Sequence, residues 1–393
     1  MEKSAIFERT RSVEPWMIKT RRALHQIPEL GTQVFQTQEL ITDELDAMGV
    51  SYETFATSVV AFIDSGKPGP CAGFRAEMDA LPLEEAANVA FRSKNAGRMH
   101  ACGHDAHMAI ALGLAKVLIE NRDMFSGCVK IFFQPAEETE GGADMMISEG
   151  CLENPYVDKI FALHVNPAIP VGMVETKPGA INASTDDLLI RIHGRSGHGA
   201  HPEGGFDAIV CAASVISTLQ TIISRNVAPT QSAVIHFGTI QGGVAPNVIC
   251  DDVTITGTLR TTDQSLRGYI MKRSAGVCHG VCSAMNCMDD VDIKSDYRAV
   301  INHEDEAEMV LDVARELFGK HAAHTMSLSS MGADDFGCFI ENRPGAYFNI
   351  GCANPRRIPF PPLHNRGFML DEDCLGVGLA MYLGLLNRLQ PNE

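Results

Sequence analysis

The stretch VKIFFQPAEE, residues 129–138, begins with a short, mostly apolar run that stops at a proline and is followed by two adjacent glutamates. A run of this kind is typical of a strand buried in a parallel sheet. Open α/β sheets gather their functional groups just beyond the carboxyl ends of their strands. The stretch therefore predicts a buried strand and, at its end, a chemical site that contains Glu137 and Glu138.

Similar strand-like runs occur on either side of this stretch. They are SVVAFID (58–64), CAGFRAEM (71–78) and KIFALH (159–164). Helical segments lie between them, with apolar residues at helical spacing from Ala106 to Phe125 and a further helix expected over 37–48. Because strands that alternate with helices form α/β sheets, we expect a catalytic α/β domain with a mainly parallel sheet.

The pattern changes near residue 182, where the expected order becomes strand, helix, strand, strand, helix, strand. The segments are DDLLIRIHG, FDAIVCAASVISTLQTIISR, SAVIHFGTI, VTITGTLRT, a helix over 266–285, and DVDIKSD. This order is that of a ferredoxin-like α+β domain. Helical periodicity returns from about Ala307. We therefore predict a catalytic domain over 1–181 and 293–393, interrupted by an inserted domain over 182–292.

Composition restricts the class of protein. The chain has 393 residues and a net charge of -17, which favours two domains and argues against nucleic-acid or anionic-membrane partners, since these need a basic face. The N-terminal MEKSAIFERTRSVEPW lacks the apolar centre of a signal peptide. No apolar run approaches the roughly 20 residues that span a bilayer. The 12 cysteines are scattered, so we expect reduced thiols and a cytoplasmic enzyme.

The stretch MHACGHDAHMA, residues 99–109, concentrates histidine and cysteine. Cys102 and His104 can chelate one ion or contribute to two, and their side chains suit zinc, or manganese, cobalt or nickel where carboxylates complete the site. Two other interpretations remain open: a helix start capped by polar residues, and a cysteine nucleophile with His104 or His107 as its base. We favour metal, because this spacing does not readily supply the separate base and orienting group of a thiolate mechanism.

Two further residues are expected at the same edge of the sheet as Glu137 and Glu138. Asp79 follows the run CAGFRAEM, and His164 ends the run KIFALH. Taken singly, Asp79 is a turn residue, His164 a core histidine and the glutamates an exposed acidic loop. Their shared position favours one metal site, in which one glutamate binds metal and the other handles protons. His364, after a Pro-rich loop, is a candidate last ligand.

With these residues laid out, the sequence closely resembles the aminoacylase/carboxypeptidase G metallopeptidase family. Within it, the chain is most similar to the amidohydrolase branch of indole-acetyl-amino-acid, hippurate and aminobenzoyl-glutamate hydrolases. The matching stretches cover nearly the whole chain in order and are jointly far more specific than a single metal motif. They are RRALHQIPELG (21–31), FRAEMDALPL (74–83), MHACGHDAHMA (99–109), FQPAEE (133–138), ALH (162–164), GRSGHGAHPE (194–203), APNVI (245–249), GTLRT (257–261), MGADDF (331–336) and LHNRGF (363–368).

The resemblance implies a site for two divalent metal ions, Mn²⁺ or Zn²⁺ in the first place and Co²⁺ or Ni²⁺ as alternatives. The implied ligands are Cys102, His104, Glu138, His164 and His364, with the thiolate as the bridge. Glu137 would be the general base that activates a metal-bridging water. Asp79 would act as a catalytic residue from outside the ligand set, by orienting a ligand histidine or tuning the site.

The resemblance also implies that the inserted domain is a lid and dimerisation domain, and hence that the protein is a homodimer or a higher homo-oligomer. His198 would polarise the scissile carbonyl, usually from the partner subunit. Asn247 and Arg260 would hold the free carboxylate of the substrate, for which an arginine fork has suitable geometry. Without the family, Arg260 is simply an exposed strand arginine.

Several positions depart from the branch. Glu77 stands where the branch usually has Asp, Asp334 where it usually has Glu, and HNRGF (364–368) where it usually has H-x-P-x-F; His201 replaces a position that is often hydrophobic. The role of His107 stays open. The implied function is metal-dependent cleavage of N-acyl or N-aroyl amino acids. The alternatives are a dipeptidase or an N-acetyl-diaminopimelate deacetylase of the same family, and a binding protein that kept the fold without turnover.

Overall fold

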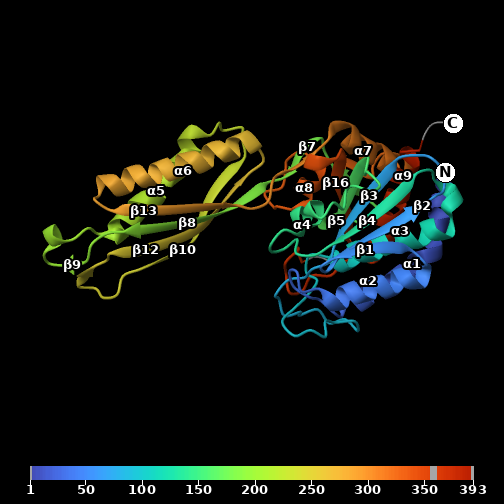
Figure 1. Ribbon diagram of the computed structural model, residues 1–393, viewed down its shortest axis with the longest axis horizontal. Helices are drawn as coiled ribbons and strands as arrows, with labels where there is room; N and C mark the ends of the chain where they lie inside the picture. The colour runs from blue at the N-terminus through green and yellow to red at the C-terminus, as the bar shows by residue number, and fades with distance from the viewer. Residues whose placement is uncertain (1, 355–360, 391–393) are drawn as a thin grey trace. The chain divides into compact units, whose positions relative to one another are not determined.

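The computed structural model describes residues 2–354 and 361–390, and the chain divides into two compact units. Unit 1 comprises Met1–Gly179, Ile301–Leu328 and Asp335–Glu393, and unit 2 comprises Ala180–Val300 and Ser329–Asp334. Each unit has its own hydrophobic core. Figure 1 shows the helices and strands of both units. The domain limits at 182 and 292 stay predictions. Unit 2 also contains the short segment 329–334, which was expected in the catalytic domain.

Unit 1 is built on an eight-stranded sheet with the order β1-β2-β4-β3-β5-β16-β6-β15. Its central strands run parallel: β4 (Cys128–Gln134), β3 (Cys71–Glu77), β5 (Lys159–Pro170) and β16 (Gly345–Ala353). The flanking strands are β1 (Ser51–Phe55), β2 (Ser58–Asp64), β6 (Val174–Thr176) and β15 (Ala323–Thr325), most of which pair antiparallel with their neighbours. The prediction of an α/β domain with a mainly parallel sheet is confirmed.

Helices cover this sheet. The long ones are α1 (Lys3–His25), α2 (Phe35–Met48), α3 (His104–Glu120), α7 (Glu304–Phe318) and α9 (Asp373–Arg388), and the short ones are α4 (Gly142–Ser148), α8 (Phe336–Asn342) and the 3₁₀ turn η1 (Arg122–Met124). Helix α3 is buried along almost its whole length and packs against both α1 and α9. A Cβ at Gly113 would lie 2.4 Å from Met17 Sδ, so α1 approaches α3 where glycine leaves room.

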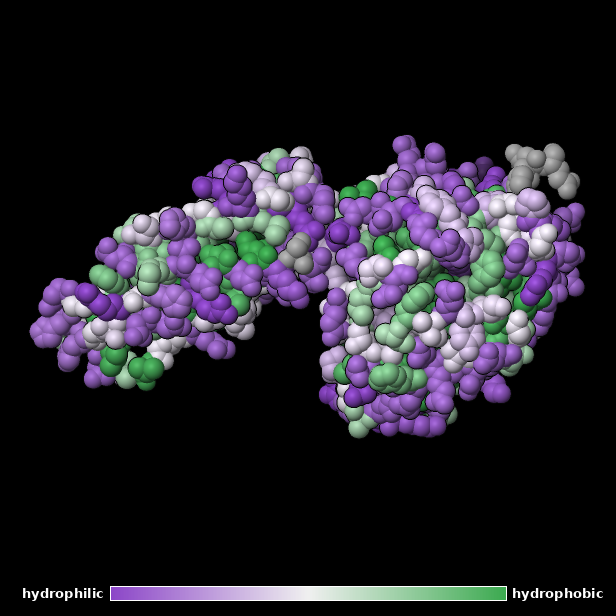
Figure 2. All heavy atoms as spheres, viewed as in Figure 1, coloured by the Kyte–Doolittle hydropathy of each residue, from purple (hydrophilic) through white to green (hydrophobic). Residues whose placement is uncertain are grey.

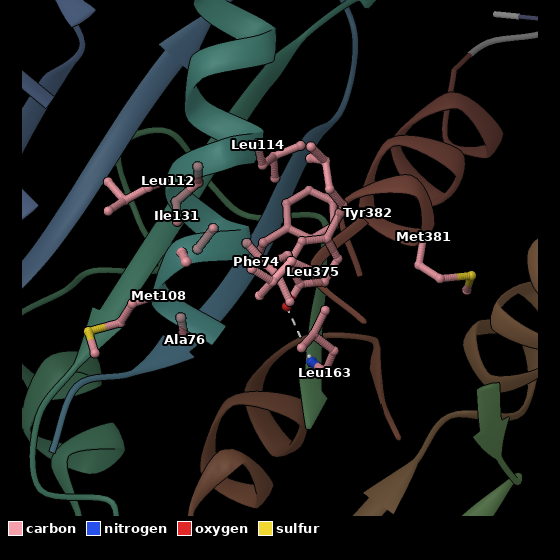
Figure 3. Packing of buried hydrophobic residues seen from close by; sticks show 14 of the residues in the cluster. Phe74, Ala76, Met108, Leu112, Leu114, Ile131, Leu163, Leu375, Met381 and Tyr382 are labelled. Carbon is pink, nitrogen blue, oxygen red and sulfur yellow. Dashed lines mark hydrogen bonds between the residues drawn. The ribbon is translucent and has the colours of Figure 1, made fainter. Parts of the chain in front are cut away.

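Aromatic residues tie α9 to the sheet in the core of unit 1 (Figure 3). The rings of Phe74 and Tyr382 have centroids 4.6 Å apart. The Tyr382 hydroxyl accepts a hydrogen bond from Leu163 N at 3.2 Å and donates one to Arg75 O at 3.2 Å. Burial of each large apolar side chain contributes about 1.5–3 kcal/mol, and the satisfied hydroxyl avoids the cost of an unpaired buried polar group. The contact fixes α9 against β3 and β5.

Unit 2 contains a four-stranded antiparallel sheet with the order β10-β12-β8-β13. Its elements are β8 (Ser184–His193), α5 (Ala208–Asn226), β10 (Ala233–Gly242), β12 (Asp252–Thr261), α6 (Gln264–Ala284) and β13 (Met288–Ser295). Asp207 and Asp263 cap the two helices by accepting backbone N–H groups of the first turn. The predicted strand, helix, strand, strand, helix, strand order is thus confirmed. Shorter elements are β7 (Gly179–Asn182), β9 (Gly197–His198), η2 (Pro202–Gly204), β11 (Val248–Ile249) and β14 (Val300–Asn302).

Helix α5 corrects the expectation that no apolar segment is long enough to span a bilayer. By length and composition alone, this 19-residue helix is apolar enough to cross a membrane, as are many core helices of globular proteins. Cys211, Val215 and Leu219 are buried in the core of unit 2, whereas Ile209 and Val210 are exposed. On the face drawn in Figure 2, hydrophilic residues predominate and apolar ones form scattered groups.

Candidate metal centre

The metal centre lies at the carboxyl-terminal edge of the unit 1 sheet. Asp79 follows β3, and Glu137 and Glu138 follow β4. His164 lies within β5, which continues to Pro170 rather than ending at His164 as expected. The pairing of β5 with β3 stops at Arg75↔Ala162, however, so His164 stands level with the end of β3. The parallel strands therefore bring these side chains to one edge.

Local backbone conformations support the site. Gly103 has φ 88°, and a Cβ there would lie 2.4 Å from Val165 Cγ2, so glycine is needed where the start of α3 approaches β5. Ala136 and His364 also have positive φ values, 59° and 60°. Such values are uncommon for residues with a side chain, and they concentrate at functional sites. Here they aim the segments that carry Glu137 and the imidazole of His364.

The predicted ligands converge. Cys102 Sγ lies 3.3 Å from His164 Nε2 and 3.3 Å from His364 Nε2. His364 Nε2 lies 3.2 Å from Glu138 Oε1, and His104 Nε2 lies 3.8 Å from Glu137 Oε2. Two groups of these side chains could each hold a metal ion. They are Cys102, Glu138 and His364, and His104, Glu137 and Glu138.

The protonation pattern of His104 fits a metal ligand. Its Nδ1 lies 2.8 Å from the carbonyl oxygen of Asp79, which places the proton on Nδ1 and the lone pair on Nε2. Nε2 is buried and has no hydrogen-bond partner among the residues that the structure describes. An unpaired buried polar atom costs about 1–3 kcal/mol, and coordination of a cation by this lone pair removes that cost. The donor set of thiolate, imidazole and carboxylate suits divalent transition metals.

Burial controls the charge states of the candidate ligands. Desolvation lowers the pKa of His104 and lowers the pKa of His164 to about 3, so both imidazoles are neutral, as metal ligation requires. His164 Nδ1 donates a hydrogen bond to Val165 O at 2.8 Å, which leaves the lone pair of Nε2 free to bind metal. Desolvation raises the pKa of the Cys102 thiol. For Glu138, burial raises the pKa but hydrogen bonding to His364 and nearby histidines outweigh it, so the net shift is downward.

Asp79 organises the loop that carries both glutamates. Its Oδ1 accepts the backbone N–H of Glu137 and its Oδ2 accepts that of Glu138, each at 3.0 Å. Its carbonyl oxygen orients His104, as described above. Burial raises the pKa of the Asp79 carboxyl well above its usual range, although the hydrogen bonds from the two amides lower it in part. Asp79 therefore contacts the backbone of the site from outside the ligand set.

The structure assigns a place to His107, whose role the sequence leaves open. Its Nδ1 lies 2.7 Å from Glu77 Oε2, and its Nε2 accepts the backbone N–H of Val165 at 3.0 Å. Both ring nitrogens are thus engaged, although Glu77, His104, His107 and His164 lie close enough together to hold a metal ion. We therefore regard His107 as a support for β5 beside His164. The sequence signal was its position three residues after His104 on the same helix face.

Glu77 belongs to a buried charge network that the sequence did not predict. Arg75 pairs with Glu77 and, through Nη2, with Asp335 Oδ1 at 2.7 Å. Asp335 also accepts hydrogen bonds from the Gln134 side chain and from Ala143 N. Because Ala143 lies shortly after the glutamate loop, this network holds the far side of that loop.

The remaining predicted residues lie in unit 2. His198 is exposed on β9, and its Nδ1 accepts the N–H of Ala200 at 3.1 Å. Asn247 is exposed just before β11. Arg260 is partly buried on β12 and donates to Met331 O at 3.0 Å.

Comparisons with known proteins identify the family. The chain matches Peptidase family M20/M25/M40 over residues 73–388. The chain belongs to this family. It is 38% identical over 370 residues to an N-acetyldiaminopimelate deacetylase of Anoxybacillus flavithermus, with 93% of this chain and 95% of the relative covered. It is 35% identical over 387 residues to IAA-amino acid hydrolase ILR1-like 2 of Arabidopsis thaliana, with 96% and 86% covered.

A solved structure agrees with this family assignment. The Bacillus subtilis YXEP protein, described as a dinuclear metal binding peptidase from the M20 family, superposes with a TM-score of 0.83 at 30% identity, covering 96% of this chain and 98% of that one. The family resemblance expected from the sequence motifs is therefore confirmed. The M20/M25/M40 chain is a metal-dependent amidohydrolase with a site for two divalent ions.

Proposed function

We propose that this M20/M25/M40 enzyme hydrolyses N-acyl or N-aroyl amino acids to a carboxylic acid and a free amino acid. The observation that carries the proposal is the convergence of five side chains that could bind metal, with Glu137 beside them. The two relatives named above support the substrate class, since one is named for an acetylated diaminopimelate and the other for an IAA-amino acid.

In this proposal the ligands are Cys102, His104, Glu138, His164 and His364. Divalent ions held there supply positive charge that acidifies water and polarises the scissile carbonyl. Glu137 takes a proton from the water as its oxygen adds to the carbonyl carbon, and returns that proton to the amide nitrogen as the C–N bond breaks. Asp79 holds Glu137 in place through its backbone N–H. Manganese or zinc suits the mixed donor set, with cobalt or nickel as alternatives.

Unit 2 supplies substrate contacts in this proposal. Because His198 Nδ1 accepts a hydrogen bond, the ring proton lies on Nε2, which can donate to the carbonyl oxygen of the substrate. Asn247 and Arg260 hold the substrate carboxylate, and the bond to Met331 O fixes the orientation of the Arg260 guanidinium. We further propose a homodimer, in which His198 serves the partner's site, and a cytoplasmic location.

A second candidate is N-acetyldiaminopimelate deacetylation, which the relative at 38% identity favours. It uses the same chemistry on a small acyl group and a longer amino acid with two carboxylates. The two candidates differ in their products, so identification of the released amine distinguishes them.

The test is amino-acid release from N-acetyl, N-benzoyl, N-indoleacetyl and long-chain N-acyl amino acids, from N-acetyldiaminopimelate and from dipeptides. Each assay uses metal-stripped protein with and without Mn²⁺, Zn²⁺, Co²⁺ or Ni²⁺. We expect metal-dependent release, and the ranking of acyl groups then defines the preferred substrate. Folded protein that releases nothing from any substrate with any metal would contradict the proposal and favour a binding protein on this fold.

A further inference from the structure

Arg21, on α1, is a buried cation outside the ligand set. Its side chain is 3% exposed, and its Nε donates to Asp105 Oδ2 at 2.7 Å. Its Nη1 donates to Glu372 Oε1 at 3.2 Å. Glu372 also receives Arg22, whose Nη2 lies 2.6 Å from Oε2. One guanidinium thus joins carboxylates that are far apart in the sequence.

The two carboxylates stand on the segments that deliver metal ligands. Asp105 directly follows His104 in the first turn of α3, shortly after Cys102. Glu372 precedes α9, at the end of the segment that begins with His364. Arg21 therefore bridges the two segments from which the cysteine and the last histidine are supplied.

His25, one helical turn after Arg21, reinforces the Asp105 side of this bridge. Its Nδ1 lies 2.8 Å from Asp105 Oδ2 and its Nε2 lies 3.2 Å from Glu85 Oε1. Arg21, His25 and Asp105 are all buried. Removal of one partner from a buried ionic group leaves the other charges uncompensated, so loss of Arg21 would release Asp105 and Glu372 from each other.

We propose that Arg21 is a positioning residue for the metal centre, which sets the separation of the Cys102–His104 segment from the His364 segment. This inference rests on the ligand assignment of the proposed function. Groups that orient ligands from outside the metal's own ligand set typically affect metal affinity by about 10–100-fold. Arg21 acts one step further out, through the carboxylates that hold the ligand segments.

The surroundings of Arg21 offer a specific test. Arg21, Arg22, His25, Phe91 and Glu372 are among the residues that line a cavity of about 380 Å³. The guanidinium carbons of Arg21 and Arg22 each lie 5.0 Å from the centre of the Phe91 ring. Since Arg22 is 47% exposed, this cavity is reachable from solvent. A small guanidinium ion can therefore enter the space that the substitution Arg21→Ala leaves.

The experiment measures the affinity of metal-stripped protein for Mn²⁺ and Zn²⁺ by chelator competition, together with thermal unfolding without metal. Arg21→Ala is compared with Arg343→Ala, which removes another buried cation of unit 1, paired with Glu153 and away from the ligand segments. We expect affinity to fall about tenfold or more in Arg21→Ala and to stay near the wild-type value in Arg343→Ala. We also expect millimolar methylguanidinium, but not equimolar urea, to restore the metal affinity of Arg21→Ala.

Unchanged affinity in Arg21→Ala, an equal loss in Arg343→Ala, or equal restoration by urea would overturn the inference. If Arg21→Ala does not fold, Arg21→Lys decides the matter, because it keeps the charge but cannot reach both carboxylates with a planar fork; wild-type affinity in that variant would also overturn it. The readout is binding rather than turnover. Wild-type protein that binds metal without hydrolysing amides would contradict the proposed function and leave this inference standing.

Discussion

Asp79→Asn is the substitution whose effect follows most directly from the geometry. The Asp79 carboxylate accepts two backbone N–H groups, from Glu137 and from Glu138, each at 3.0 Å. An asparagine can replace only one acceptor, and its NH₂ group would face the other N–H donor. The substitution therefore removes one hydrogen bond and leaves one buried N–H donor unpaired.

A buried donor that loses its hydrogen-bond partner costs about 1–3 kcal/mol. If about 2 kcal/mol of this appears as misplacement of the Glu137 carboxylate in the transition state, kcat falls about thirtyfold. The assay measures kcat and metal content in parallel. Asp158→Asn is the control, because Asp158 accepts the N–H of Cys71 at 2.7 Å at the other end of β3 and should leave kcat unchanged.

Two results would refute this reasoning about Asp79. One is a kcat within about threefold of the wild type at full metal content, which corresponds to less than about 1 kcal/mol of transition-state stabilisation. The other is an equal fall in kcat for Asp158→Asn.

Three further predictions concern the metal centre and the buried charges around it. His107→Leu should lower the free energy of unfolding by about 3 kcal/mol, because it leaves Glu77 short of a buried partner; chemical denaturation of metal-free protein measures this, and an unchanged midpoint would contradict it. Burial lowers the pKa of His25, but Asp105 and Glu85 outweigh burial and Arg21, so the net shift is upward from 6.5. The stabilisation by His25 is therefore present below pH 6.5 and is lost as pH rises through the folded-state pKa, so the stability difference from His25→Gln should shrink with rising pH; a difference that grows would contradict the assignment. A chelator should abolish hydrolysis while far-ultraviolet circular dichroism stays near native, and Mn²⁺ or Zn²⁺ should restore it; activity that survives complete metal removal would exclude this chemistry.

The fold could be read from the sequence where local pattern and burial agree. The run SVVAFID coincides with β2, and CAGFRAEM differs from β3 by one residue, because short β-branched and apolar runs in a buried sheet carry a strong local signal. The inserted order of strands and helices was visible for the same reason. The membrane-spanning length and hydropathy of helix α5 were missed, because polar residues interrupt its apolar sequence. Its average hydropathy is nevertheless high.

The proposed site could be predicted where one short motif carries its chemistry. Cys102 and His104 share a motif. The sheet brings together Glu137, which lies just beyond β4, and His164, which lies within β5. The supporting charges were not predictable, since Arg21 and Glu372 meet only after α1 and the segment before α9 have packed. Tertiary structure decides which charged side chains pair, and no spacing in the sequence encodes these pairs.

The central claim is that Glu137 moves the proton while the neighbouring side chains bind metal. The most direct test compares single-turnover hydrolysis by wild-type protein and Glu137→Gln, each with its bound metal quantified. A general base contributes about 10²–10⁴-fold, so the account predicts a rate loss of that size with two metal ions still bound. A Glu137→Gln variant that retains both ions and hydrolyses its substrate at the wild-type rate would contradict the account.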